Sequence, residues 1–198
     1  MNTLSLRPLA AVAALALAAG FDVTCAVLDT HALKCWGWNA VGQLGLGDTL
    51  SRGDVAGSMG DALPTVDLGP GAQVDAVDVG NYHVCALLHD GTLRCWGDAN
   101  ASGQPTSHGA APGTMGDALP AVDLGTKRTA RQMAASYNTS CAILDDGSTK
   151  CWGGNGEGEL GLEDKKGRGS EPGTMGDALP AIDFGGGRRA VQMAPSSY

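Results

Sequence analysis

Apolar and polar residues alternate in short runs along the chain, which is the pattern of half-buried β-strands. Residues 73–80, QVDAVDVG, alternate in this way. Residues 83–89 and 92–96, HVCALLH and TLRCW, flank Asp90-Gly91, a dipeptide typical of β-hairpin turns. A fourth run, ALPAVDLG at 118–125, ends at a glycine. No segment has a sustained helical period, so we predict an all-β chain with four short strands in each unit.

The strand pattern recurs along the chain. The segment MGDALP begins at Met59, Met115 and Met175, with steps of 56 and 60 residues, and the first cysteine of each pair lies at 25, 85 and 141. Four short strands in a unit of this length are typical of a β-propeller blade. We therefore predict an incomplete β-propeller, an open arc of about three four-stranded blades. The predicted boundaries are a leader or first strand at 1–19, blades at 20–69, 70–125 and 126–185, and the start of a further repeat at 186–198.

Each unit carries two cysteines ten positions apart on either side of the predicted turn. With a three-residue loop at 89–91, Leu88 pairs with Thr92, and counting outward places Cys85 opposite Cys95. Opposed strand residues have Cα atoms about 4.5–5.5 Å apart, within the range of a disulfide. The same count pairs Cys25 with Cys35 and Cys141 with Cys151. Six buried free thiols are the alternative, and zinc is disfavoured because no C-x2-C motif is present.

A tryptophan and a glycine follow the second cysteine of each pair. The tryptophans project from the opposite face of the strand to the cysteines, so we expect the rings and the cysteine pairs to fill the layers between blades. The glycines allow the chain to leave the strand sharply. The predicted packing residues are Trp36, Trp96, Trp152, Gly37, Gly97 and Gly153.

The first twenty residues have the features of a secretory leader. Arg7 precedes an apolar stretch from Leu9 to Ala19, and Ala16-Leu17-Ala18 fits a small-x-small cleavage site. The stretch is too short to span a membrane as a stable helix. A buried strand is the alternative, because Gly20 stands where Gly80 stands in the next unit. A leader and paired cysteines both favour an oxidising location: extracellular, cell-surface or periplasmic.

Charge and side-chain chemistry narrow the function. The net charge is −8, whereas nucleic-acid binding through phosphates needs a basic surface. The four histidines, His31, His83, His89 and His108, show no metal-ligand spacing. No phosphate loop, nucleophile elbow or paired-carboxylate arrangement is present, so we expect no enzyme activity, cofactor or metal. The variable loops at 45–54 and 161–171 are candidate binding segments, with a solvated connection as the alternative.

The combined motifs resemble the regulator of chromosome condensation repeat family. The matching segments are CAVLDTHALKCWGWNAVGQLGLGD at 25–48, GNYHVCALLHDGTLRCWGDANASGQ at 80–104 and CAILDDGSTKCWGGNGEGELGLED at 141–164. The doubled cysteine resembles a bacterial, secreted branch of that family. The family histidine is kept only as His83, and the family's GQLG at 42–45 becomes GQPT at 103–106. These departures favour a structural role for both positions.

The resemblance implies a propeller, usually seven-bladed, that binds a protein partner. We expect a non-enzymatic secreted or cell-surface module that uses its inter-strand loops for binding. The alternative is guanine-nucleotide exchange on a small GTPase, the activity of the family's eukaryotic namesake. The register places a further cysteine shortly after Tyr198, so we expect the chain to be part of a longer array, which assembles with further repeats or other chains.

Overall fold

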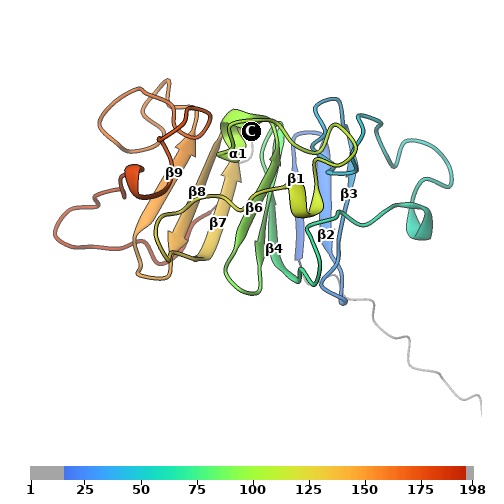
Figure 1. Cartoon of the computed structure of the whole chain (residues 1–198), viewed down its shortest axis with the longest axis horizontal. Helices are drawn as coiled ribbons and strands as arrows, with labels where there is room; N and C mark the ends of the chain where they lie inside the picture. The colour runs from blue at the N-terminus through green and yellow to red at the C-terminus, as the bar shows by residue number, and fades with distance from the viewer. Residues whose placement is uncertain (1–15, 195–198) are drawn as a thin grey trace, which may run out of the picture.

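The computed structural model describes residues 16–194 as three antiparallel β-sheets in a row. Figure 1 shows them side by side in chain order, with the first sheet on the right and the third on the left. Each sheet has three strands in sequence order. We call them blades 1, 2 and 3. The strands are β1 Ala16–Gly20, β2 Val23–Val27 and β3 Leu33–Gly37, then β4 Val74–Val79, β5 His83–Leu88 and β6 Leu93–Gly97, then β7 Ala130–Ser136, β8 Thr139–Leu144 and β9 Thr149–Gly153.

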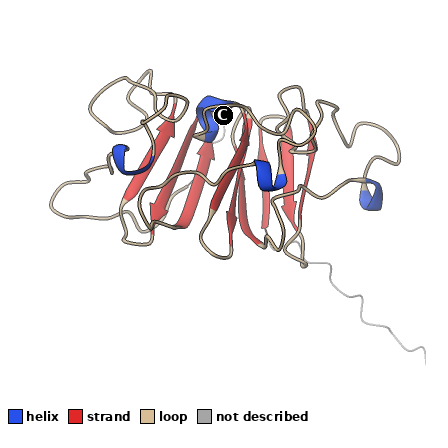
Figure 2. Ribbon diagram, in the orientation of Figure 1, coloured by secondary structure: helices blue, strands red, loops and turns tan. Residues whose placement is uncertain are grey.

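The fold class is confirmed: the described chain is an all-β, incomplete propeller. The backbones of adjacent blades lie closest at the first two strands of each sheet: β1 and β2 contact β4, and β4 and β5 contact β7. The hairpin register is also confirmed, because Leu88 donates its backbone N–H to Thr92 at 2.9 Å and Cys85 stands opposite Cys95. The red strands of Figure 2 run across the row in similar directions, with tan loops at both edges.

The predicted fourth strand of each blade is not a strand. Residues 118–125 leave a 3₁₀ turn and follow the outer edge of β6 with one backbone hydrogen bond, from the Val122 N–H to the Leu93 carbonyl at 2.8 Å. Pro120 has no N–H to donate to a ladder. The Asp123 carboxylate accepts from the Gly125 N–H at 3.0 Å, which turns the chain. The blades are therefore three-stranded, with an extended segment along the outer edge.

The structure adds short helices that the hydrophobic pattern did not show. A one-turn helix, α1 Ala99–Ser102, follows β6, and 3₁₀ turns at Gly60–Ala62, Gly116–Ala118 and Gly176–Ala178 lie within the three MGDALP segments. In the part of the chain that the structure describes, no helix has the length and apolar character needed to cross a bilayer.

The first blade begins within the predicted leader. Ala16–Gly20 pairs with β2 in a continuous antiparallel register. This pairing agrees with the alternative interpretation of the segment as the first strand of blade 1. A Cβ on Gly20 would lie 2.4 Å from the Val79 carbonyl oxygen of blade 2, so the glycine permits a close approach of the two blades. Residues 1–15 of the predicted leader lie outside the described residues.

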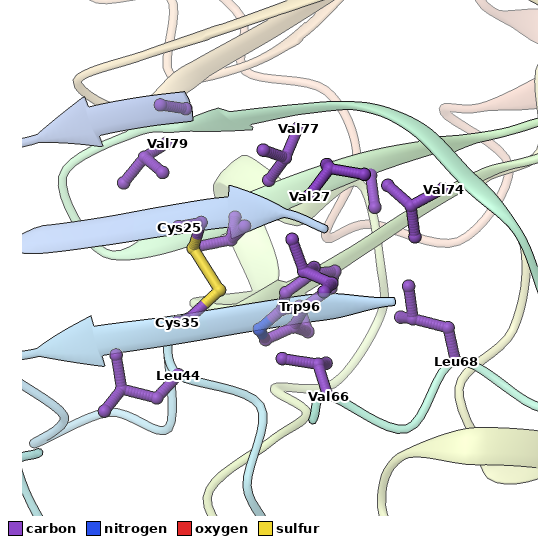
Figure 3. Packing of buried hydrophobic residues seen from close by; sticks show 14 of the residues in the cluster. Cys25, Val27, Cys35, Leu44, Val66, Leu68, Val74, Val77, Val79 and Trp96 are labelled. Atoms are coloured by element: carbon purple, nitrogen blue, oxygen red, sulfur yellow. A yellow bond between two sulfur atoms is a disulfide. The ribbon is translucent and has the colours of Figure 1, made fainter. Parts of the chain in front are cut away.

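Two hydrophobic layers, one in each gap between blades, form the core. Figure 3 shows the first layer, in which the cysteine pair of blade 1 lies close to Trp96 of blade 2. The second layer combines Cys85 and Cys95 of blade 2 with Trp152 of blade 3. Each layer is thus built from the cysteine face of one blade and the tryptophan face of the next.

Candidate functional site

The six cysteines form three pairs, each inside one hairpin. The sulfur atoms are 2.15 Å apart in Cys25–Cys35, 2.12 Å in Cys85–Cys95 and 2.03 Å in Cys141–Cys151. The Cα–Cα distance is 4.1 Å in every pair. The geometry is that of three local disulfides, which is the pairing that the hairpin register predicts.

The three tryptophans differ in burial according to their neighbours. Trp96 and Trp152 are fully buried between blades. The indole N–H of Trp96 donates to the Gln43 carbonyl of blade 1 at 3.0 Å, so this ring also links two blades by a hydrogen bond. Trp36 of blade 1 is only half-buried. Trp96 and Trp152 therefore belong to the joints between blades rather than to a ligand site.

The glycine after each tryptophan marks a close backbone approach. Gly37, Gly97 and Gly153 have φ values of 110°, 97° and 112°. A Cβ on Gly97 would lie 2.3 Å from the Tyr82 carbonyl oxygen, and the other two glycines have the same kind of contact. A side chain at this position requires both an unfavourable φ and a steric overlap.

Long loops leave the outer strands at one edge of the row. We call it the upper edge, since Figure 1 shows the loops after β3 and β9 along its top. In blade 3, Asn155 organises the loop: its side chain accepts from the Leu160 N–H at 3.0 Å and donates to the carbonyls of Asp164 and Lys166 at 2.9 and 3.1 Å. Asn39 makes the corresponding bonds in blade 1. The sequence analysis did not single out these buried asparagines, although each follows its Trp-Gly pair at a fixed spacing.

An ion pair between an aspartate and an arginine fixes the C-terminal part of each of these two loops. Arg52 contacts Asp48 at 2.7 Å, and Arg168 contacts Asp164 at 2.7 Å. The Lys166 backbone N–H and the Arg168 guanidinium together lower the pKa of Asp164. Arg52 belongs to an Arg-Gly-Asp sequence, but its guanidinium is committed to this loop, which explains the residue without a cell-adhesion role.

The upper loop of blade 2 contains a helical turn instead of the asparagine frame, but it also places a glycine against the tryptophan of the next blade. Asp98 caps α1 by accepting from the Asn100 N–H at 3.1 Å, and the helix ends at Gly103 with φ 72°. A Cβ on Gly103 would lie 2.6 Å from the Trp152 indole nitrogen, just as one on Gly45 would lie 2.8 Å from that of Trp96. Gly103 of blade 2 therefore occupies the position of Gly45, the last glycine of GQLG at 42–45. The sequence alignment of GQPT with GQLG instead matches Gly103 with Gly42, the first glycine, and is wrong in space.

The loops hold different exposed side chains on this common frame. Leu50 and Lys166 supply the carbonyls bonded to Asn39 and Asn155, so they occupy matching positions. Both side chains are exposed. A hydrophobic residue on one blade thus corresponds to a cation on another, while the backbone is held in the same way.

An exposed aromatic cluster lies at the upper edge between blades 1 and 2. The ring of Tyr82 is 6.5 Å from Phe21 and 5.8 Å from Trp38, centroid to centroid. Phe21 and Trp38 are both exposed. Clustered exposed aromatic rings are typical of protein-binding surfaces. We call Phe21, Trp38 and Tyr82 the aromatic cluster; the sequence analysis missed it because the three residues come from separate turns.

The histidines do not form a common site. His83 is fully buried, and its Nε2 lies 2.8 Å from the Ser140 hydroxyl. Burial lowers the pKa of His83 to about 4. His89 and His31 lie on either side of Asp75, with nitrogen–oxygen distances of 3.0 and 3.6 Å. His108 pairs with Gly97 through the backbone at the start of the upper loop.

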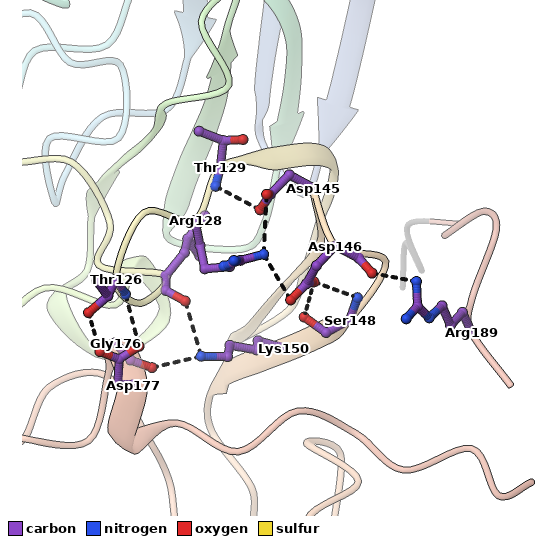
Figure 4. Close-up of polar contacts among 11 residues, drawn as sticks. Thr126, Arg128, Thr129, Asp145, Asp146, Ser148, Lys150, Gly176, Asp177 and Arg189 are labelled. Atoms are coloured by element: carbon purple, nitrogen blue, oxygen red, sulfur yellow. Dashed lines mark hydrogen bonds and ion pairs between the residues drawn. The ribbon is translucent and has the colours of Figure 1, made fainter. Parts of the chain in front are cut away.

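A cation on each outer strand holds the adjoining 3₁₀ turn. Lys34 donates to the Gly60 carbonyl at 2.7 Å, Arg94 to Gly116 at 2.9 Å and Lys150 to Gly176 at 2.8 Å. Figure 4 shows the third case, where Lys150 lies close to Gly176 and Asp177. The hydroxyl and backbone N–H of Thr126 and the nearby Lys150 charge lower the pKa of Asp177. The repeated pattern favours a structural role for these cations.

No residues assemble into a metal centre within 16–194: the histidine, cysteine, aspartate and glutamate side chains there form no group of three or more suited to a metal ion. The features that the described residues bring together are inter-blade joints and an edge of ordered loops with an aromatic cluster. Such an edge is suited to contact with another macromolecule.

Stacked three-stranded sheets that all repeat one hairpin, and of which blades 1 and 3 share one loop frame, define a tandem-repeat protein of the β-propeller class. The Regulator of chromosome condensation (RCC1) repeat matches residues 15–43, 74–104 and 130–159. The chain therefore carries three RCC1 repeats and belongs to that repeat family. The matched segments contain the three hairpins and the whole first strand of each blade.

Individual relatives agree with this assignment. The chain is 28% identical over 152 residues to the X-linked retinitis pigmentosa GTPase regulator of Mus musculus, which covers 75% of the chain and 14% of that protein. In fold it is similar to yeast RCC1 (Prp20), crystallised with Kap60, with a TM-score of 0.51, 20% identity, and coverage of 82% of this chain and 37% of that one. A second structure of Prp20p, from Saccharomyces cerevisiae, gives a TM-score of 0.50 at 20% identity, with coverage of 80% and 37%. The chain thus spans only a minor part of the length of these relatives.

Proposed function

We propose that this chain is part of a non-enzymatic, secreted or cell-surface β-propeller module that binds a protein partner through its upper edge. The observation that carries the proposal is the aromatic cluster, in which Phe21 and Trp38 are exposed beside the blade 1 loop whose backbone is fixed by the buried Asn39. Fixed loops lose little conformational entropy on binding, and aromatic side chains supply large contact areas.

The cysteine pairs support the location. Disulfides persist in extracellular and periplasmic compartments and are rare in the cytosol, where thiols stay reduced. Three pairs at bonding distance within 198 residues fit an oxidising compartment. Because residues 16–19 of the predicted leader form part of β1, a leader that directs export has to be cleaved before Ala16 to leave blade 1 intact, and N-terminal sequencing of the exported protein would define the cleavage position.

The binding proposal is tested with partners recovered on the full-length protein from the compartment to which it is exported. Trp38→Ala and Tyr82→Ala are each expected to weaken retention of a specific partner at least tenfold, because large aromatic truncations at an interface centre have effects of about 2 kcal/mol or more. His89→Ala is the control, since His89 is exposed in the hairpin turn at the opposite edge. Equal retention by all three variants would refute a role for the upper edge.

Regulation of a small GTPase is the second candidate. It is favoured by the similarity to a mouse protein named as a GTPase regulator and by the Prp20p structure, described with its binding properties to Gsp1p and histones. An exchange factor acts in a reducing compartment, where the cysteines would be thiols. Accelerated release of labelled nucleotide from a small GTPase, by cytosolic protein with six free thiols, would replace the first proposal with this one.

A further inference from the structure

One backbone hydrogen bond repeats at the upper edge of every blade and aligns the three blades there. The residue after the outer strand donates its N–H to a carbonyl in the turn between the first two strands, at 2.8 Å each time. The three bonds run from Trp38 to Asp22, from Asp98 to Tyr82 and from Gly154 to Asn138. The residues joined in this way occupy matching positions.

This alignment shows that the fold does not require the aromatic cluster. The cluster lies over the joint between blades 1 and 2. The matching positions over the joint between blades 2 and 3 are polar in place of Phe21, Trp38 and Tyr82: they are Asn81, Asp98 and Asn138. The second joint therefore forms without any of the three rings, so the packing of the blades does not explain why the first joint carries them.

The rings of the cluster offer their faces to a ligand. The Tyr82 ring is inclined by 53° to that of Phe21 and by 59° to that of Trp38, with centroid distances of 6.5 and 5.8 Å. Phe21 is 63% exposed and Trp38 36% exposed. A cation is attracted to a ring face when it lies within about 6 Å of the centroid. Because the spacing of the rings is comparable with this range, one cation can reach Tyr82 together with a neighbouring ring.

Two carboxylates adjoin the rings. Asp22 follows Phe21 in the same turn and is exposed, and Asp98 is bonded through its backbone to Tyr82. Within residues 16–194, no ion pair joins either carboxylate to a lysine, arginine or histidine. The cluster thus combines open ring faces with negative charge that no described cation neutralises.

The loops around the cluster supply no free cation either. The upper loops of blades 1 and 2, residues 38–58 and 98–114, contain a single lysine or arginine, which is Arg52. Its guanidinium is held by Asp48 at 2.7 Å. A positive side chain for the rings therefore has to come from another molecule, and the charge of the surroundings favours one that is cationic.

We propose that the aromatic cluster binds an exposed arginine of the protein partner, with the guanidinium stacked on the rings and paired with Asp22. This inference rests on the proposed binding role of the upper edge and names the chemistry of the partner. Arginine fits better than lysine because its planar, weakly hydrated guanidinium stacks on aromatic faces and donates to a carboxylate through two N–H groups at once.

The test is an NMR titration of the full chain, isotopically labelled in its tryptophans, with Nα-acetyl-arginine amide as the probe. The indole N–H signal of Trp38 is identified by its loss in Trp38→Gly, which copies Gly154 of blade 3. This signal is expected to shift and saturate with the probe. Nα-acetyl-citrulline amide has nearly the same shape without the charge, and is expected to bind about threefold more weakly or less. Nα-acetyl-lysine amide is expected to lie between the two. Equal binding of the citrulline or lysine probe, or no saturable shift with the arginine probe, would overturn the proposal.

Asp22→Asn separates the charge from the rings and copies Asn138 of blade 3, so the fold tolerates the new residue. It is expected to weaken binding of the arginine probe about threefold and to leave the citrulline probe unaffected. Asp29→Asn is the matched control, because it removes the same charge from an exposed aspartate in the hairpin turn at the opposite edge. Circular dichroism checks that both variants are folded. Identical affinities of the two variants for the arginine probe would refute the role of Asp22.

Retention of the recovered partner distinguishes this inference from the proposed function. Both are supported if Trp38→Ala, Asp22→Asn and added salt all weaken retention, since salt screens an exposed charge pair. If Trp38→Ala weakens retention but Asp22→Asn and salt do not, the upper edge remains the binding surface and the arginine is excluded. If none of the three changes retention, both proposals fail.

Discussion

Residues that face each other across a joint match in polarity: they are both polar in one joint and both apolar in the other. The His83 ring of blade 2 contacts the Ser140 hydroxyl of blade 3, and this hydroxyl donates to the Ala101 carbonyl at 2.8 Å. Since the serine hydrogen is used in that bond, His83 is assigned as the donor from Nε2, a neutral tautomer. The matching positions of the first joint are Val23 and Val84, both buried in one apolar cluster. A polar pair in one joint is thus replaced by an apolar pair in the other.

The buried histidine makes stability sensitive to acid. The unfolded chain takes up a proton near the ordinary histidine pKa of about 6.5, whereas folded His83 remains neutral down to a pKa of about 4. The free energy of unfolding therefore falls as the pH is lowered between these values, by about 3 kcal/mol in total. Burial raises the pKa of Asp78, which acts in the opposite direction because the folded state then binds a proton more readily.

The double variant His83→Val/Ser140→Val copies the Val23 and Val84 pair of the first joint and leaves Asp78 in place. We expect it to lose most of the fall in stability between about pH 7 and about pH 4.5. Urea denaturation at both pH values measures the difference. An unchanged acid dependence in the double variant would show that another group controls it.

At the scale of the element, the backbone shape of the upper loops in blades 1 and 3 depends mainly on one buried asparagine in each loop. Asn155 bonds to Leu160, Asp164 and Lys166, and Asn39 bonds to the matching residues. Between these anchors two glycines and one leucine are the same in blades 1 and 3, whereas Val41, Gly47 and Thr49 of blade 1 correspond to Glu157, Glu163 and Lys165 of blade 3. The frame therefore allows the exposed side chains to change without a change in loop shape.

Asn155→Ala is expected to loosen the whole loop of blade 3, because it leaves several buried or half-buried backbone groups without a partner, at about 1–3 kcal/mol. Hydrogen exchange of the 156–167 amides measures the effect, which should be largest at Leu160. Asn100→Ala is the control: this asparagine lies half-buried in the upper loop of blade 2 and its side chain makes one 3.3 Å contact, with Ser170. Similar exchange rates in the two variants would contradict the role assigned to Asn155.

For the whole molecule, stability comes from the joints between blades and from the crosslink inside each blade. Every blade is a thin three-stranded sheet with a core on its faces only, and such sheets gain stability chiefly by stacking on neighbours. The cysteine pairs of blades 1 and 2 lie in these same layers, so each of these two pairs links its hairpin at the point where the tryptophan of the next blade packs.

Cys85→Ala/Cys95→Ala is expected to lower the free energy of unfolding by about 2–4 kcal/mol, because a crosslink restricts the unfolded chain. Urea unfolding is measured with and without reductant. Reductant should destabilise the wild type by more than the variant, which retains only the pairs of blades 1 and 3. If reductant does not change the unfolding midpoint of the wild type, the cysteines are free thiols.

The sequence by itself determined the period of the repeat, the hairpin register and the partner of each cysteine. These are local properties, fixed by alternation over a few residues and by a turn whose length sets the pairing. It also indicated the propeller class, because units of this length with short strands bury their faces only by stacking.

Only the tertiary structure decided what meets across the gaps between blades. The aromatic cluster joins turns from two blades, and Gly103 takes the place of Gly45 through an inserted helical turn. The outer segment is not a fourth strand, because Pro120 lacks a donor and the Asp123 carbonyl bonds instead to Gly176 of the next blade. Such contacts depend on how separate repeats stack, and residues distant along the chain leave no periodic signal that reveals them.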